Sequence, residues 1–264
     1  MALTIPTKKR PRLLDPHRLV GVVYGSEGVG KSTFASGFKD PLFIALEPGL
    51  AGLEAYEAEI DGQPIVHWSW ALFREWVDLL TGEGAHQFGT VVIDTLDRLT
   101  ALAVDETCRK YRVPELSGSP KSAVYWSHVK VMLSVALEQL TSAGFGVILI
   151  AHEKTETIEA KTGRVVGMME RPQGETFQRF VPSGGSAYRA IAARADYILR
   201  AAVDLRTGRR VLECSPSATR IAKDRSGVLP EVLPLDYAAF LECFRSAYAA
   251  DNRGGSDNEE QSTA

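Results

Sequence analysis

The stretch of sequence that decides the fold is Gly25-Ser26-Glu27-Gly28-Val29-Gly30-Lys31-Ser32-Thr33. It fits the pattern G-x-x-x-x-G-K-[ST] at every fixed position. Glycines in such a loop let the backbone curl until several N–H groups point at one anion, and the helix that follows adds the positive end of its dipole. The stretch therefore predicts a site for the phosphates of a nucleotide. The alternative is a glycine-rich turn that matches the pattern by chance.

The segments on both sides of the loop favour the phosphate site. Residues 19–24 form a short apolar run rich in β-branched side chains, as in a buried strand, and residues 32–38 can begin a helix. Strand, loop and helix are the setting in which Lys31 reaches the β- and γ-phosphates and Ser32 ligates Mg²⁺. We expect all residues of the 25–33 loop to contact the nucleotide.

Length and composition indicate one large α/β domain with tails. The chain has 264 residues, of which 45% are hydrophobic and 24% charged, and it is long enough to bury a full core. We expect a basic arm over residues 1–17, a domain over 18–249 and a disordered acidic tail over 250–264. The formal net charge of −3 falls on the segment after Ala250. The neutral body gives no general electrostatic argument for nucleic acid, so any such contact must come from local patches.

The cysteines and the N-terminus indicate a soluble, cytoplasmic protein without a membrane partner. Cys108, Cys214 and Cys243 are widely spaced, and none belongs to a C-x-x-C pair. We expect buried thiols rather than disulfides or a zinc site. The basic N-terminal arm lacks the apolar core of a signal peptide, and no apolar run approaches the length of a membrane span.

Three further buried strands are predicted, and each is followed by a polar side chain. The apolar runs end at Glu47, Asp94 and His152. In a parallel α/β sheet, ligand chemistry gathers at the carboxyl ends of the strands. The run 90–94 has the Walker B pattern, so Asp94 would hold Mg²⁺ together with Ser32. The alternative is that Asp94 only caps the helix after it.

The remaining pattern completes an α/β chain. Periodic apolar positions predict helices over residues 71–80, 95–112, 122–142 and 235–250. Residues 65–68 favour a short strand, and residues 195–203 and 209–214 are expected to pair as a β-hairpin.

The segment 153–189 lacks apolar runs and is expected to be a long irregular loop. Such a loop in a compact domain is usually functional or disordered. Its second half interleaves cationic and aromatic residues, namely Arg171, Phe177, Arg179, Phe180, Tyr188 and Arg189. Single-stranded nucleic acid needs charges for its backbone and rings that stack on its bases. A surface lid of ordinary loop composition is the alternative.

The order of these motifs, ending in Lys223-x-Arg225, resembles that of the RecA-like ATPases. It more closely resembles the core-only RecA-like proteins of bacteriophages, which are small single-strand annealing ATPases. The resemblance covers roughly residues 18–249, and its motifs are specific at the phosphate loop and the Walker B strand. It implies a RecA-like P-loop NTPase core with a mostly parallel central sheet, helices on both faces and a C-terminal β-hairpin.

The resemblance also implies roles for single residues. Glu47 matches the glutamate that polarises the attacking water, although it could be only a turn cap before Pro48. His152 takes the place of a polar residue that senses the γ-phosphate. RecA has a glutamine there, and a satisfied histidine at a strand end is the alternative. The loops 113–121 and 153–189 would face DNA.

Lys223 and Arg225 are similar to the K-x-R element of hexameric helicases. The resemblance implies that these two cations reach the γ-phosphate bound by a neighbouring subunit, with Lys31, Glu47 and His152 as the other catalytic residues. On a strand both side chains point to the same side. The alternative is that they are two solvated charges on an exposed edge.

The function implied is an oligomeric ATPase, in a ring or a filament, that uses ATP and Mg²⁺. It would bind single-stranded DNA and promote annealing or strand pairing in phage recombination, and its acidic tail could dock a single-strand-binding protein. The alternatives are a helicase, helicase loader or replication accessory ATPase, a small-molecule kinase, and a nucleotide switch without catalysis.

Overall fold

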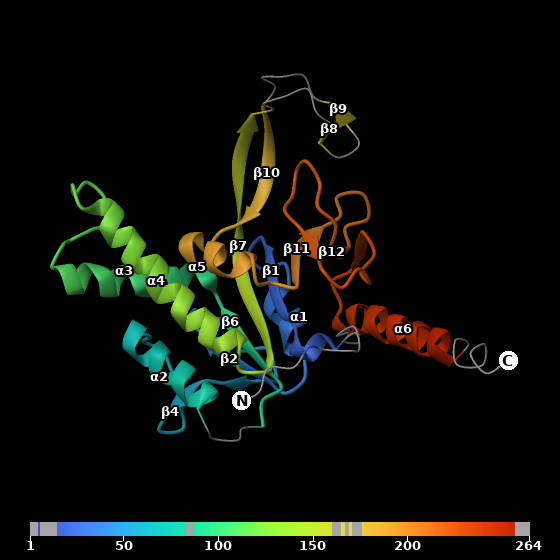
Figure 1. Ribbon diagram of the computed structural model, residues 1–264, viewed down its shortest axis with the longest axis horizontal. Helices are drawn as coiled ribbons and strands as arrows, with labels where there is room; N and C mark the ends of the chain where they lie inside the picture. The colour runs from blue at the N-terminus through green and yellow to red at the C-terminus, as the bar shows by residue number, and fades with distance from the viewer. Residues whose placement is uncertain are drawn as a thin grey trace.

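A central sheet carries helices on both of its faces (Figure 1). The computed structural model describes residues 5, 15–82, 87–159, 165–166, 169–170 and 176–256, with the backbone alone for 165–166, 169–170 and 250–256. The main sheet has the strand order β14 (Val232–Pro234), β12 (Arg210–Glu213), β11 (Tyr197–Val203), β1 (Val20–Gly25), β7 (Gly146–Glu159), β6 (Thr90–Asp94), β2 (Pro41–Ala45) and β3 (Tyr56–Glu57).

The other elements are attached to this sheet or cover it. The remaining strands are β4 (Glu59–Ile60), β5 (Gln63–Pro64), β8 (Val165–Val166), β9 (Met169–Glu170), β10 (Thr176–Pro182) and β13 (Lys223–Asp224). The helices are the 3₁₀ turn η1 (Pro16–Arg18), α1 (Lys31–Ser36), α2 (Trp70–Thr81), α3 (Leu96–Tyr111), α4 (Ser122–Thr141), α5 (Gly185–Ala192) and α6 (Tyr237–Ser256).

The strands from β11 to β2 are parallel, so their carboxyl ends lie along one edge of the sheet. In this register Gly25 pairs with His152, and Ala45 pairs with Asp94. β12 returns antiparallel to β11 and forms the C-terminal hairpin. The expected fold is confirmed: this is a RecA-like P-loop core with a mostly parallel sheet, helices on both faces and a C-terminal hairpin.

Two apolar cores lie on the two faces of the sheet. Successive residues of β1 enter opposite cores, since Val22 and Tyr24 join the side chains of α2 to α5 and Val23 joins those of α1 and α6. Strands buried on both faces need apolar residues at nearly every position. This explains why the central strands appear in the sequence as continuous apolar runs.

The segment 153–189 is not the long irregular loop that the sequence predicted. β7 continues to Glu159, β10 returns antiparallel beside it, and α5 follows. Figure 1 shows this ribbon projecting away from the body of the molecule. Residues 154–157 are all exposed, so this part of the strand has no core to fill. Because this strand has no apolar run, the hydrophobic pattern of the sequence does not predict it.

Two other predicted boundaries differ from the structure. Residues 65–68 form no strand; instead the Trp68 indole donates to the Ala45 carbonyl (2.7 Å) at the end of β2. The C-terminal helix, predicted to end at Ala250, continues to Ser256. Phe240 and Phe244 anchor the helix in the core on the α1 face. The added residues 251–256 include two glycines and are weak helix formers, so propensity gave no signal for this extension. Among the described residues, no helix combines the length and apolar character needed to cross a bilayer.

Candidate nucleotide site

A cavity of about 620 Å³ opens at the carboxyl edge of the sheet. Its walls are the phosphate loop, the loop after β2, the end of β6, His152 in the middle of β7, and Arg210. The parallel register brings these segments together, because the strands that carry them end at the same edge. The predicted residues Glu47, Asp94 and His152 all line this one cavity.

The phosphate loop has the backbone conformation that its glycines were expected to provide. Gly28 and Gly30 have φ angles of 68° and 109°, which are values that residues with a Cβ rarely adopt. Gly30 precedes the first residue of α1, and no side chain caps that helix. The N–H groups at the start of the helix are therefore left for another acceptor.

Lys31 is buried at the base of the cavity, 6% exposed. Its Nζ donates to the carbonyl oxygens of Gly25 (3.0 Å) and Ser26 (2.8 Å) within the loop. Burial lowers the pKa of this ammonium, and the nearby Asp94 and Glu27 carboxylates oppose that shift. A desolvated cation lining a cavity fits a phosphate ligand, which would replace the loop carbonyls as the partner of Lys31.

The Ser32 hydroxyl donates to the Asp94 carboxylate over 2.6 Å. Burial raises the pKa of Asp94, while the hydrogen bond from Ser32 acts in the opposite direction. Two adjacent oxygen ligands fit Mg²⁺, which usually keeps several waters and takes the rest from phosphates. Among the described residues, no cluster of three or more His, Cys, Asp or Glu could hold a metal by itself. A metal here would need the nucleotide and water to complete its coordination.

Both carboxylate oxygens of Glu47 are held in place. The Thr95 hydroxyl donates to Oε1 (2.9 Å), and the His152 Nε2 lies 3.2 Å from Oε2. Thr95 was not singled out from the sequence. It follows Asp94 through a cis peptide bond, is 2% exposed, and also accepts from the Arg98 N–H as the cap of α3. A capping threonine directly after a Walker B strand was the signal available.

The middle of β7, at His152, is tied to the starts of α3 and α5 through Asp97. The Asp97 carboxylate accepts from the His152 N–H (3.1 Å) and from the Gly184 N–H (2.9 Å). This side chain therefore fixes the backbone that presents His152 to Glu47. Its sequence position indicated only an acid in the first turn of a helix.

Lys223 and Arg225 do not line the cavity of their own subunit. The Lys223 Nζ donates to the Ala192 carbonyl (3.0 Å), and the Arg225 Nη2 donates to the Ala193 carbonyl (2.6 Å). Both cations thus sit at the C-terminal end of α5, where positive charge is favourable. Both side chains contact the same end of α5, so they lie on one side. If they contact a γ-phosphate, it is one bound by a neighbouring subunit.

The residues predicted to contact nucleic acid do not gather on one loop. Phe177, Arg179 and Phe180 lie on β10, Tyr188 and Arg189 lie on α5, and Arg171 falls outside the described residues. Phe177 is buried, and the Arg200 guanidinium stacks on the Phe180 ring with 3.8 Å to its centroid. Both rings are already packed within the protein, because the segment is a ribbon and a helix and not a free loop.

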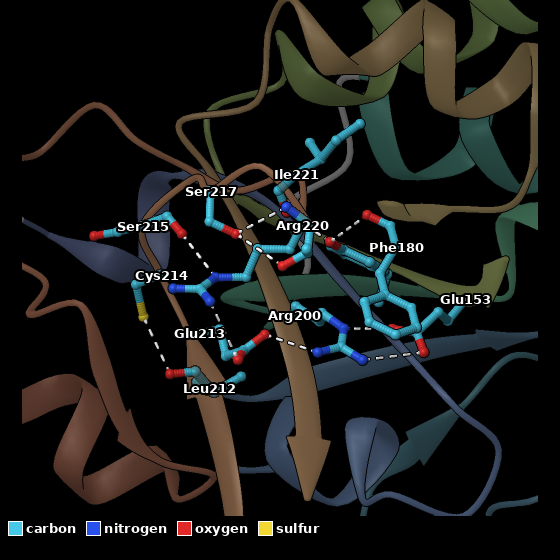
Figure 2. Close-up of polar contacts among 12 residues, drawn as sticks. Glu153, Phe180, Arg200, Leu212, Glu213, Cys214, Ser215, Ser217, Arg220 and Ile221 are labelled. Carbon is cyan, nitrogen blue, oxygen red and sulfur yellow. Dashed lines mark hydrogen bonds and ion pairs between the residues drawn. The ribbon is translucent and has the colours of Figure 1, made fainter. Parts of the chain in front are cut away.

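An ionic network beside the site holds together the strands that border it (Figure 2). Arg200 on β11 donates to Glu153 on β7 (2.5 and 3.2 Å) and to Glu213 on β12 (2.9 Å). Arg220 donates to the same Glu213 (3.4 Å) and to the Ser215 carbonyl (2.9 Å). No short motif connects these residues, so only the fold could reveal them.

The strand order, the phosphate loop and the Ser32–Asp94 pair together define a RecA-like P-loop NTPase. A family model described as an AAA domain matches residues 17–226. The match covers most of the chain, and the chain therefore belongs to this family.

Comparison with known proteins found one curated relative, the SPbeta prophage-derived uncharacterized protein YorG of Bacillus subtilis (strain 168). It is 27% identical over 146 residues, which are 54% of this chain and 42% of YorG. This chain thus spans less than half the length of that relative.

Similar solved structures include the RadB recombinase, with a TM-score of 0.38, 18% identity and coverage of 74% of this chain and 80% of that chain. The KaiC-like protein PH0186 from Pyrococcus horikoshii OT3 has a TM-score of 0.41, 12% identity and coverage of 76% and 80%. At these TM-scores the likenesses add nothing to the fold that the strand order already shows.

Proposed function

We propose that this chain hydrolyses ATP with Mg²⁺ as a homo-oligomer, and that it binds single-stranded DNA to promote annealing or strand pairing in phage-type recombination. The observation that carries the hydrolysis is the Glu47 carboxylate, which Thr95 and His152 hold inside the cavity of the phosphate loop. An oriented carboxylate beside a phosphate site is what positions an attacking water.

In this mechanism Glu47 orients a water molecule and accepts its proton as the water oxygen attacks the γ-phosphorus. The bond from the γ-phosphorus to the bridging oxygen breaks at the same centre, and ADP leaves with phosphate. Lys31 turns from the loop carbonyls to the β- and γ-phosphate oxygens. Magnesium on Ser32 and Asp94 would neutralise charge on the same phosphates. His152, in contact with Glu47, would register whether a γ-phosphate is present.

We propose assembly because Lys223 and Arg225, the two cations expected at the γ-phosphate, are absent from the cavity of their own subunit. Lys223 and Arg225 do not line their own cavity but contact the end of α5, and the Arg225 side chain is 51% exposed. An arginine supplied by a neighbour stabilises the charge of the transition state in many NTPases of this class. Activity would then depend on the assembly of subunits.

DNA binding is proposed for the β7–β10 ribbon and the adjoining helix α5. The ribbon projects from the body (Figure 1). Its pairing begins at Glu153, the residue after His152, so a change at the site can reach it along one strand. Arg171, Arg179, Tyr188 and Arg189 are the proposed contacts, and Phe177 and Phe180 would have to leave their present packing to stack on bases. The prophage origin of YorG supports the phage setting of this proposal.

The test is ATP turnover with and without single-stranded DNA, for the unmodified protein and for Glu47→Gln. We expect stimulation by DNA, and a loss of about 10²- to 10⁴-fold in Glu47→Gln with ATP binding retained. Lys31→Ala is the control that loses nucleotide binding itself. If single-stranded DNA neither binds nor alters turnover, the recombination role is wrong. Displacement of a strand from a forked duplex would indicate a helicase instead.

A further inference from the structure

Arg210 lies over the phosphate loop, although it comes from the C-terminal hairpin. It begins β12, its position is fixed by pairing with Val203, and its carbonyl accepts from the Leu235 N–H (3.1 Å). The side chain lines the same cavity as Lys31 and Ser32. Its Nη1 lies 3.3 Å, and its Cδ 4.0 Å, from where a Cβ on Gly30 would stand. The sequence gave this residue no role beyond the hairpin.

The Arg210 guanidinium has no partner among the described residues, with neither an ion pair nor a side-chain hydrogen bond. The neighbouring arginines differ, since Arg200 and Arg220 both share the Glu213 carboxylate. A guanidinium has five N–H donors and always carries its charge. An unpaired arginine at the mouth of a phosphate-binding cavity is therefore available for an anionic ligand.

From this position we propose that Arg210 is a second nucleotide-binding cation of the same subunit, and that it contacts the phosphates that ADP and ATP share. The inference rests on the proposed nucleotide site. The N–H groups of a phosphate loop cradle the α- and β-phosphates, and Arg210 stands over Gly30 in that loop. Its fork of donors suits two phosphate oxygens at once.

The ionic network explains how a hairpin residue can serve this site. Glu213 lies on the same short strand as Arg210 and accepts a hydrogen bond from Arg200. Arg200 also donates to Glu153, the residue after His152 (Figure 2). β12 and β7 are thus clamped to β11 between them. Arg210 and His152 approach the cavity from strands that are fixed relative to each other, and a rigid strand is a more exact support for a binding group than a loop.

The experiment measures the affinity of Arg210→Gln and Arg210→Lys for ADP, GDP and a non-hydrolysable ATP analogue by isothermal titration calorimetry with Mg²⁺. We expect Arg210→Gln to weaken ADP and the ATP analogue by a similar factor of about 10 to 100, the loss of hydrogen bonds to a charged group. Arg210→Lys keeps the charge without the fork, so its loss should be smaller. Arg209→Gln is the matched control, because Arg209 does not line the cavity, and its affinities should be unchanged.

Several outcomes would overturn the inference. Unchanged ADP affinity in Arg210→Gln would show that the guanidinium does not bind the shared phosphates. A loss confined to the ATP analogue would put it at the γ-phosphate, and a loss confined to one base would put it on the nucleobase. If the unmodified protein bound none of the three nucleotides, the proposed function would fail together with this inference. Equal melting temperatures without nucleotide show that the variants are folded.

Discussion

Function and stability act against each other at Asp94. Burial raises the pKa of its carboxyl, and a carboxyl whose pKa is higher in the folded state destabilises the fold once it is ionised. That cost is fully present above the raised folded-state pKa, and it is lost as the pH falls through that pKa toward the ordinary aspartate value of about 3.9. In the proposed function, the carboxylate is kept near Ser32 because the two groups together would hold Mg²⁺.

We therefore expect Asp94→Asn to stabilise the protein without nucleotide or metal at pH 7.5. The gain should shrink steadily as the pH is lowered toward 4, since the native carboxyl then becomes neutral as well. Urea unfolding across this pH range measures the effect, and titration with ATP and Mg²⁺ should show weaker binding. Asp97→Asn is the comparison. The Asp97 carboxylate accepts hydrogen bonds from two backbone N–H groups, and an amide would accept them more weakly, so this variant should be less stable. A destabilised Asp94→Asn would contradict the argument.

Thr95 is predicted to be a positioning residue for Glu47. Thr95→Val keeps the shape of the side chain but removes the hydroxyl that donates to Glu47 and caps α3. We expect the free energy of unfolding to fall by about 1 kcal/mol. We also expect kcat to fall about tenfold, as for one hydrogen bond to a charged group, with KM little changed. Thr95→Ser should restore both quantities. Recovery of stability without recovery of kcat would mean that the hydroxyl acts only as a cap.

Among the elements, β7, β11 and β12 depend on the Arg200 guanidinium. The Arg200 side chain is 15% exposed, and the Glu153 and Glu213 side chains are 14% and 18% exposed. Arg200→Met removes the cation, which leaves the largely buried Glu153 carboxylate without an ion-pair partner among the described residues and leaves Glu213 with Arg220 alone. We expect a loss of about 3 kcal/mol in the free energy of unfolding, at the lower end for a broken buried pair. Urea denaturation measures this loss.

The exposed Arg109–Glu106 pair provides the control for this prediction. The Arg109 side chain is 68% exposed, and pairs of this kind contribute roughly 0 to 1 kcal/mol. Arg109→Met should therefore change stability by about 0.5 kcal/mol or less. If Arg200→Met were equally mild, the network would not be what holds the three strands together.

The sequence could predict those elements whose signal is local. β6 begins and ends at the predicted residues Thr90 and Asp94, because a strand buried on both faces leaves a continuous apolar run. The exposed ribbon has no such run, so the sequence pattern predicts a loop there. Arg210 and Arg200 also lay beyond prediction, since each meets its site or its partners through strand pairing between distant segments. Thr95 could have been found, because it follows a recognised strand end.

At the scale of the whole molecule, the topology explains why the site is open on one side. The parallel strands bring the phosphate loop, Glu47, Asp94 and His152 to one edge, while Lys223 and Arg225 lie at the end of α5. One chain therefore presents a nucleotide cavity and, separately, a pair of cations. Such a separation suits a head-to-tail contact, which closes into a ring or continues as a filament.

Mixing two inactive variants tests whether the site is composite. Arg225→Ala should bind ATP but not turn it over, and Glu47→Gln should behave in the same way for a different reason. In an equal mixture, about a quarter of the interfaces would join an intact Glu47 to an intact neighbouring Arg225, so ATP turnover should recover in part. Because Arg225 also caps α5 in its own subunit, thermal melting must first show that Arg225→Ala is folded. If mixed assemblies form and no turnover returns, or if Arg225→Ala alone is fully active, the cations do not act across the interface.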